Sequence, residues 1–231
     1  MKKLPIVLMD LDDTILDFKH DEARSIKKSF TELNIPVSDE IISLYSRINI
    51  SWWEKLEEGT ATREEVLVRR FDELFETLGI EASGQLAQEL YERELHNGHF
   101  FIEGAEALLE ELKGKYRLFI CSNGVASVQD ARIGSAGIAH YFENIFISQR
   151  IGANKPSAEF FRRCFELIPD FEPERAIMVG DSLTSDIRGG LNAGILTCRF
   201  NPNALPGRED IKPHYEISSL SQLAPLLAEL W

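Results

Sequence analysis

The chain of 231 residues is 44% hydrophobic and 27% charged, a balance typical of a folded globular protein and unlike that of a disordered chain. Its formal net charge of −13 argues against nucleic acid or an anionic membrane as a partner, because both are themselves negative. No stretch approaches the ~20 apolar residues of a membrane span. The three cysteines do not indicate a disulfide framework, so we expect a cytoplasmic protein with reduced thiols.

The first predicted element is a strand over residues 6–9, whose sequence Ile-Val-Leu-Met is too short and too β-branched for a helix. A run this apolar indicates burial on both faces, as in a parallel sheet. Asp10 and Asp12 follow it, and in extended geometry their side chains leave on the same side. Two carboxylates this close destabilise a fold unless a cation or a shared proton compensates, which favours a chemical role over a packing role.

Beyond residue 17 the pattern is helical, with no strand candidate of comparable quality until after residue 100. Helices are predicted over residues 21–33, 41–53, 63–78 and 85–95. Gly59, Gly79 and the pair Asn97-Gly98 supply the breaks. This pattern predicts an all-helical cap over residues 18–100, inserted into a core formed by residues 1–17 and 101–231.

Strand and helix alternate through the rest of the chain. Strands are predicted over residues 116–121, 144–147, 176–179, 195–199 and 214–217. Helices are predicted over residues 105–112, 125–136, 158–168, 185–193 and 220–230. The alternation indicates an α/β fold with a mostly parallel sheet and helices on both faces.

Conspicuous polar residues come just after the predicted strands. Asp10, Ser122 and Asp181 each follow a strand directly or by a residue or two, and Lys155 follows another strand through a loop. The carboxyl ends of parallel strands share one edge of a sheet, so we expect these side chains to converge there. With Asp12 and Asp186 the group holds too many acids to share a pocket without a cation.

The oxygen-rich set favours Mg²⁺, with Asp10, Asp12, Asp181 and Asp186 as candidate ligands. An anionic substrate would then be attracted by the metal and by Lys155. Amide donors near residues 13–14 and 122–124, the latter including Asn123 and Gly124, would add to that attraction. Phosphate fits this set best, so a small-molecule phosphate ester is the expected partner.

Asp10 is the candidate nucleophile, forming an acyl phosphate that splits one difficult displacement into two easier ones. Asp12 would protonate the leaving oxygen and then activate the water that hydrolyses the intermediate. Thr14 and Ser122 would donate hydroxyl hydrogen bonds to the transferring group, and Lys155 would neutralise its charge. Asp181 would complete the metal site. Asp186 would hold a metal-bound water or orient Lys155.

These stretches together resemble the motifs of the haloacid dehalogenase superfamily, in that family's order and with a strand before each. They are Asp10-Leu11-Asp12-Asp13-Thr14, Ser122-Asn123-Gly124, Lys155-Pro156 and Gly180-Asp181-Ser182-Leu183-Thr184-Ser185-Asp186. The resemblance implies a Rossmann-like three-layer core, an aspartyl-phosphate mechanism, Mg²⁺ and a helical cap inserted after the first motif.

A narrower set of stretches is similar to the pyrimidine 5′-nucleotidase branch of that superfamily. They are Ile15-Leu16-Asp17-Phe18, Trp52-Trp53, Ile187-Arg188-Gly189-Gly190, Asn192-Ala193-Gly194, Thr197-Cys198 and Asn201-Pro202. This similarity implies a pyrimidine nucleoside monophosphate as substrate. Trp52 and Trp53 are adjacent and face different sides of a helix, so one is expected in the cap core and one is a candidate to stack on a base.

Other functions remain open. A phosphatase for another phosphometabolite, such as a sugar phosphate, would use the same core residues. A metal-independent 2-haloacid dehalogenase is disfavoured because such enzymes lack the second acid, here Asp12. A non-catalytic phosphoaspartate signalling domain is disfavoured because no acid closely follows Ile147 to accept the phosphoryl group, and a silent nucleotide-binding module does not need the Asp10/Asp12 pair. We expect a monomer or a weak homodimer.

Overall fold

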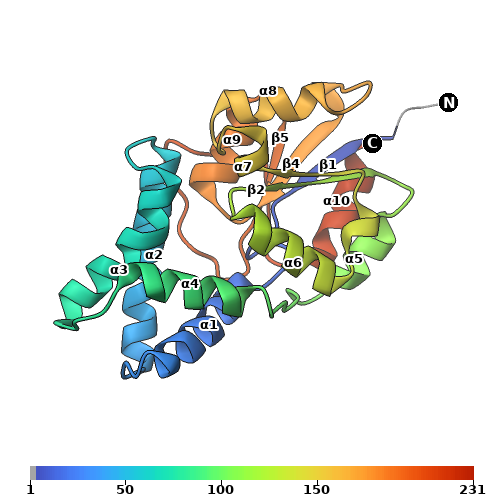
Figure 1. Ribbon diagram of the computed structural model, residues 1–231. Helices are drawn as coiled ribbons and strands as arrows, with labels where there is room; N and C mark the ends of the chain where they lie inside the picture. The colour runs from blue at the N-terminus through green and yellow to red at the C-terminus, as the bar shows by residue number, and fades with distance from the viewer. Residues whose placement is uncertain (1–3) are drawn as a thin grey trace. The chain divides into compact units, whose positions relative to one another are not determined.

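The computed structural model describes residues 4–231, so the first three residues of the expected core segment lie outside the described residues. Figure 1 shows the course of the chain. It forms two compact units, one containing the chain up to Phe18 together with His99–Trp231, and the other Lys19–Gly98. None of the helices within residues 4–231 is long and apolar enough to cross a membrane.

The first unit is built on a 6-stranded parallel sheet in the order β3-β2-β1-β4-β5-β6. Its strands are β1 (Ile6–Met9), β2 (Arg117–Ser122), β3 (Asn144–Ile147), β4 (Ala176–Gly180), β5 (Leu196–Phe200) and β6 (Tyr215–Ile217). The chain builds outward from β1 through β2 to β3, then returns to place β4 on the other side of β1. The strand order therefore reverses between β1 and β4, and open α/β sheets bind ligands at the carboxyl ends of strands at such a point.

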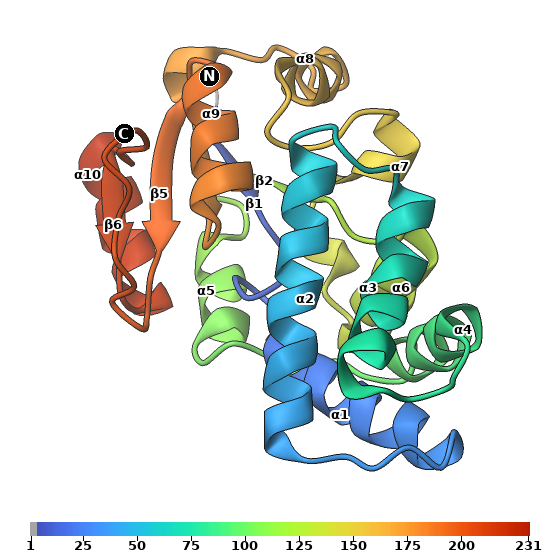
Figure 2. The same cartoon turned by 90° about the vertical axis from the view of Figure 1, so that its left-hand side faces the viewer.

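Helices cover both faces of the sheet because successive strand residues alternate between the faces. Val7 and Met9 pack in the cluster that includes α5 (Ala105–Leu112) and α10 (Leu223–Leu230). Ile6 and Leu8 pack in the opposite cluster, with the phenylalanines of α8 (Ala158–Glu166). In Figure 2 the edge strand β6 lies beside β5, with α10 next to it. The predicted Rossmann-like three-layer core is confirmed.

The second unit is all-helical, as the predicted insert requires. Its helices are α1 (Phe18–Glu32, whose first residue belongs to the other unit), α2 (Asp39–Glu57), α3 (Arg63–Leu78) and α4 (Gly84–Leu95). Thr62 and Glu65 form a capping box at the start of α3, and Gly79 ends that helix in the left-handed conformation. Ser38 caps α2, which begins at Asp39, two residues before the predicted start. The helix continues to Glu57, beyond the predicted end at residue 53. The rings of Phe30, Tyr45, Phe71, Phe75 and Tyr91 pack together in its core.

One predicted helix in the core is wrong in its first turn. Instead of beginning at residue 185, the segment forms a π-helical turn over Leu183–Ile187 and only then enters α9 (Arg188–Asn192). Ile187 N donates to Ser182 O at 3.1 Å, a bond one residue longer in span than that of an α-helix. The remaining α-helices of the described chain are α6 (Ala126–Ala136) and the short α7 (Ser148–Ile151), which was not predicted.

Candidate active site

Asp10 and Asp181 lie at the reversal point of the sheet. The Asp10 amide still donates to Val179 O at 2.8 Å, which extends the pairing of β1 with β4 by one residue. Asp181 is the first residue after β4. Sheet register therefore fixes where both side chains start, as the sequence predicted from the shared edge of parallel strands.

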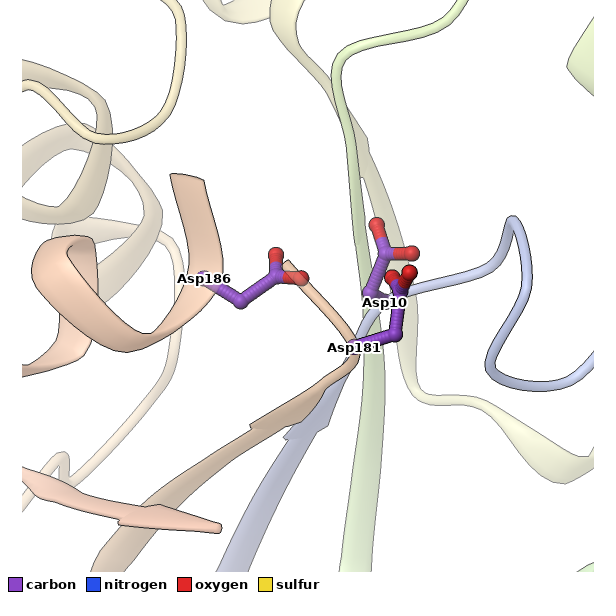
Figure 3. A group of neighbouring side chains, drawn as sticks. All are labelled: Asp10, Asp181 and Asp186. Carbon is purple, nitrogen blue, oxygen red and sulfur yellow. The ribbon is translucent and has the colours of Figure 1, made fainter. Parts of the chain in front are cut away.

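Asp186 joins these two residues from the π-helical turn. Carboxylate oxygens of Asp10, Asp181 and Asp186 all lie within 4.8 Å of one another, and Figure 3 shows the Asp186 carboxylate directed toward the other two. Asp10 and Asp186 are buried and Asp181 is half-buried, so the group keeps some access to solvent. Clustered carboxylate oxygens that retain room for water suit Mg²⁺, and the donor set fits that ion.

Close approach to Asp186 also explains the glycine that ends β4. A Cβ atom placed on Gly180 would lie 2.2 Å from Asp186 Oδ2 and 2.7 Å from Asp186 Cβ. The Asp186 carboxylate also accepts from the Ser182 amide at 3.1 Å, which holds it against this bare stretch of backbone. The absence of a side chain at position 180 is therefore part of what brings the third acid to the other two.

Lys155 is the positive charge of this cluster. Its ammonium group is buried and donates to Asp10 Oδ1 at 2.5 Å, to Asp186 Oδ1 at 2.7 Å and to Cys121 O at 2.6 Å. These three bonds match the three donors of an ammonium group. The direct bond to Asp186 is one of the two alternatives predicted for that residue.

Burial and neighbouring charges have opposite effects on the pKa values of Lys155 and Asp10. Burial alone would lower the pKa of Lys155, but Asp10 and Asp186 outweigh it and raise that pKa above its ordinary value. Burial raises the pKa of Asp10 well above its usual range, and the neighbouring acids add to the rise while Lys155 opposes it. The lysine is therefore held charged, and it is the group that makes buried carboxylates tolerable here.

The Asn123 side chain bonds to the backbone of the lysine loop. Its side-chain amide donates to Lys155 O and its carbonyl oxygen accepts from Lys155 N, each at 2.9 Å. Both ends of the side chain are thus bonded to the backbone of the lysine 32 residues further on. Asn123 thus fixes the loop that carries Lys155, and its assignment to substrate binding stays a prediction.

The hydroxyl groups predicted to meet phosphate are both buried. Ser122 Oγ accepts from Gly124 N at 3.0 Å and from Gln129 Nε2 at 2.8 Å. A serine hydroxyl has two acceptor sites and one donor, so these bonds leave its proton to donate. Thr14 Oγ1 has no hydrogen-bond partner among the described residues. Buried hydroxyl groups are normally paired, so a ligand would complete the pairing of Thr14.

The Asp12 carboxylate does not belong to the group of three acids. It is held from α6 instead, where Arg132 Nη1 donates to Asp12 Oδ1 and Gln129 Nε2 donates to Asp12 Oδ2 at 2.6 Å. Neither Gln129 nor Arg132 was predicted from the sequence as a partner of Asp12. A signal was present, since Gln129 and Arg132 are three residues apart and so share one face of a helix that starts just after the Ser122-Asn123-Gly124 stretch.

The chain is similar to known hydrolases in both sequence and fold. Residues 4–194 match the haloacid dehalogenase-like hydrolase family. YfnB of Bacillus subtilis, named as a HAD-hydrolase, is 41% identical over 227 residues, which cover 98% of this chain and 97% of YfnB. The crystal structure of YfnB bound to magnesium, for which interdomain movement is described, matches with a TM-score of 0.93 over 98% of this chain and 99% of that one.

Two further relatives are named for their reactions. The pyrimidine 5′-nucleotidase PynA of Streptococcus pneumoniae is 33% identical over 222 residues, covering 96% of this chain and 94% of PynA. The human N-acylneuraminate-9-phosphatase is 28% identical over 240 residues, covering 100% of this chain and 96% of that protein. The predicted superfamily is confirmed: the chain belongs to the haloacid dehalogenase-like hydrolases.

Proposed function

We propose that this hydrolase is a Mg²⁺-dependent phosphomonoesterase that acts on pyrimidine nucleoside monophosphates through an aspartyl phosphate on Asp10. The observation that carries the proposal is the meeting of Asp10, Asp181, Asp186 and Lys155 at the reversal point of the sheet. The pyrimidine nucleotide is supported by the similarity to PynA and by the stretches that resemble that branch.

In the first half of the reaction, an oxygen of Asp10 attacks phosphorus. The bond between phosphorus and the ester oxygen breaks as the bond to Asp10 forms, and a proton from Asp12 passes to the departing oxygen, which leaves as the nucleoside hydroxyl. Asp10, Asp181 and Asp186 would hold Mg²⁺, which would neutralise the phosphate charge that these acids otherwise repel.

In the second half, water attacks the phosphorus of the aspartyl phosphate. Asp12, now ionised, takes a proton from that water, and the bond between phosphorus and Asp10 breaks to release inorganic phosphate. Asp10 regains its carboxylate and Asp12 its proton, so the enzyme returns to its starting state.

The other polar groups stabilise charge as it moves. Ser122 donates its remaining hydroxyl proton to a phosphoryl oxygen, and Thr14 gains a partner in the same way. Lys155 holds Asp10 in one position and supplies positive charge beside it. The helical unit Lys19–Gly98 acts as the cap that selects the substrate, so exchanging it for that of a relative should change the order of preferred substrates.

A sugar phosphate is the second candidate substrate, favoured by the similarity to the N-acylneuraminate-9-phosphatase. The core chemistry would be identical, so only a substrate comparison separates the two. Dehalogenation remains disfavoured by Asp12, whose task as proton donor has no counterpart when a halide leaves.

The test is phosphate release from UMP, dTMP, AMP and several sugar monophosphates, with Mg²⁺ and then with excess chelator. We expect the pyrimidine nucleotides to be hydrolysed fastest and chelator to stop the reaction. Asp10→Asn should lose activity by orders of magnitude and keep the far-UV circular dichroism spectrum of the parent. Asp130→Asn is the matched control, because Asp130 is 51% exposed and forms a surface ion pair with Arg150. Metal-independent turnover, or an active Asp10→Asn protein, would refute the proposal.

A further inference from the structure

Arg132 is the largest fully buried side chain in the described part of the chain, and it lies on α6 beside Asp12. Its Nη1 group donates to Asp12 Oδ1 and, at 3.0 Å, to Gln129 Oε1. The guanidinium carbon lies 5.3 Å from the centre of the Phe18 ring. This arginine is therefore fixed by a carboxylate, an amide and an aromatic ring at once.

Gln129 completes the arrangement one helical turn earlier. Its amide nitrogen donates both to Asp12 Oδ2 at 2.6 Å and to Ser122 Oγ at 2.8 Å, and the side chain is buried. Both oxygens of Asp12 are thus held from a single helix, while 28% of the Asp12 side chain remains exposed. The same amide connects Asp12 to Ser122, the last residue of β2.

A buried ion pair contributes little to stability by itself, because the loss of hydration offsets most of the attraction between the charges. Apolar side chains of similar volume would pack this part of α6 at least as well. What the arginine and glutamine supply, and apolar groups cannot, is a fixed orientation. A carboxylate rotates easily about its terminal torsion, and two donors on its two oxygens restrict it to one position.

The same helix also contacts both connections to the helical unit. Phe18 is the last residue of the core before that unit, and His99 is the first after it. His99 Nδ1 lies 2.9 Å from Ser135 Oγ, which in turn donates to Arg132 O at 3.1 Å. Arg132 therefore contacts Asp12 and Phe18 directly, and His99 through Ser135.

We propose that Arg132, together with Gln129, is a positioning residue for Asp12: it orients the carboxylate that exchanges a proton with the leaving group and with water. This inference rests on the proposed function, in which Asp12 has that task. Loss of Arg132 should then impair the step in which the leaving oxygen needs a proton more than it impairs binding. Its effect should grow with the basicity of the leaving group.

The experiment compares phenyl phosphate with p-nitrophenyl phosphate, which differ little in size but whose leaving groups differ strongly in basicity. Arg132→Met should lower kcat on both substrates, and the loss on phenyl phosphate should be at least about ten times the loss on p-nitrophenyl phosphate. The KM values for both substrates should change less than about threefold. Gln129→Met should show the same pattern more weakly, and Arg132→Lys should recover part of the loss because it keeps the charge without the planar fork. Arg163→Met is the control, because Arg163 is half-exposed and pairs with Glu159 on α8. It should leave kcat and KM unchanged on both aryl phosphates.

A second comparison separates positioning from general damage. In an Asp12→Asn background, Arg132→Met should add no further dependence on the leaving group, because the group it positions is already gone. Equal losses of kcat on both aryl phosphates in folded Arg132→Met and Gln129→Met proteins would overturn the inference and leave Arg132 with a structural role. Wild-type protein inactive on both aryl phosphates and on UMP would instead refute the proposed function itself.

Discussion

Lys155 compensates two buried acids, so its removal should destabilise the core strongly. Lys155→Met keeps most of the length of the side chain and deletes the bonds to Asp10, Asp186 and Cys121 O. The side chains of Asp10 and Asp186 are only 9% and 1% exposed, so water cannot replace the lost partner without local opening.

Breaking a buried pair by removing one partner costs about 3–5 kcal/mol, and we expect Lys155→Met to fall in this range near neutral pH. The variant can remove one unpaired buried charge by binding a proton on Asp10, whose pKa is already raised. The folded Lys155→Met protein then carries a proton that the unfolded chain lacks. Its free energy of unfolding therefore falls as pH rises above the carboxyl pKa of the unfolded state. The destabilisation should therefore be smaller at about pH 5 than at about pH 8.

Urea unfolding measured on a Trp52→Phe/Trp53→Phe background gives the free energy of the core. Both tryptophans belong to the helical unit, and the remaining Trp231 packs against the core cluster, so its fluorescence follows the unit that contains Lys155. Lys113→Met is the control. Lys113 is 48% exposed and lies 4.0 Å from Glu110, and such surface pairs change stability by less than about 1 kcal/mol.

A Lys155→Met protein within about 1 kcal/mol of its parent at neutral pH would contradict this account of the cluster. So would a destabilisation that grows toward acid pH, because it would mean that the orphaned carboxyls do not take up a proton.

Three further outcomes follow from single contacts. Gly180→Ala should push Asp186 away, lowering the free energy of unfolding by about 1–3 kcal/mol and weakening Mg²⁺ binding in calorimetry; unchanged Mg²⁺ affinity would argue against the crowding seen at this glycine. Asn123→Ala removes both bonds to the Lys155 backbone and should lower kcat more than it raises KM for UMP. A rise in KM alone would instead support the predicted contact of Asn123 with the substrate. All three cysteines are buried, and burial raises the pKa of Cys198 to about 12, so a thiol reagent at mildly alkaline pH should label the protein only after unfolding; rapid labelling of native protein would contradict the packing.

Local sequence patterns were sufficient for most of the elements. The strand Ile6–Met9 and the helices Arg63–Leu78 and Ala105–Leu112 have the predicted bounds. Each is defined by signals within the segment itself, such as an apolar run cut by Asp10 or a capping box at Thr62. The π-helical turn at Leu183–Ile187 escaped prediction because a backbone bond five residues back leaves no mark in the 3.6-residue periodicity by which helices are predicted.

The sequence by itself determined which residues stand at the strand ends, because an apolar run followed by a carboxylate or a hydroxyl is a local pattern. Only the tertiary structure decided which of them meet. Asp186 accepts a hydrogen bond from Lys155, and the Asn123 side chain bonds to the backbone of that lysine. Asp12 pairs with Arg132, which lies 120 residues further along the chain. The physical reason is that the order of the strands and the docking of α6 bring these side chains together, and neither is encoded in the spacing of residues along the chain.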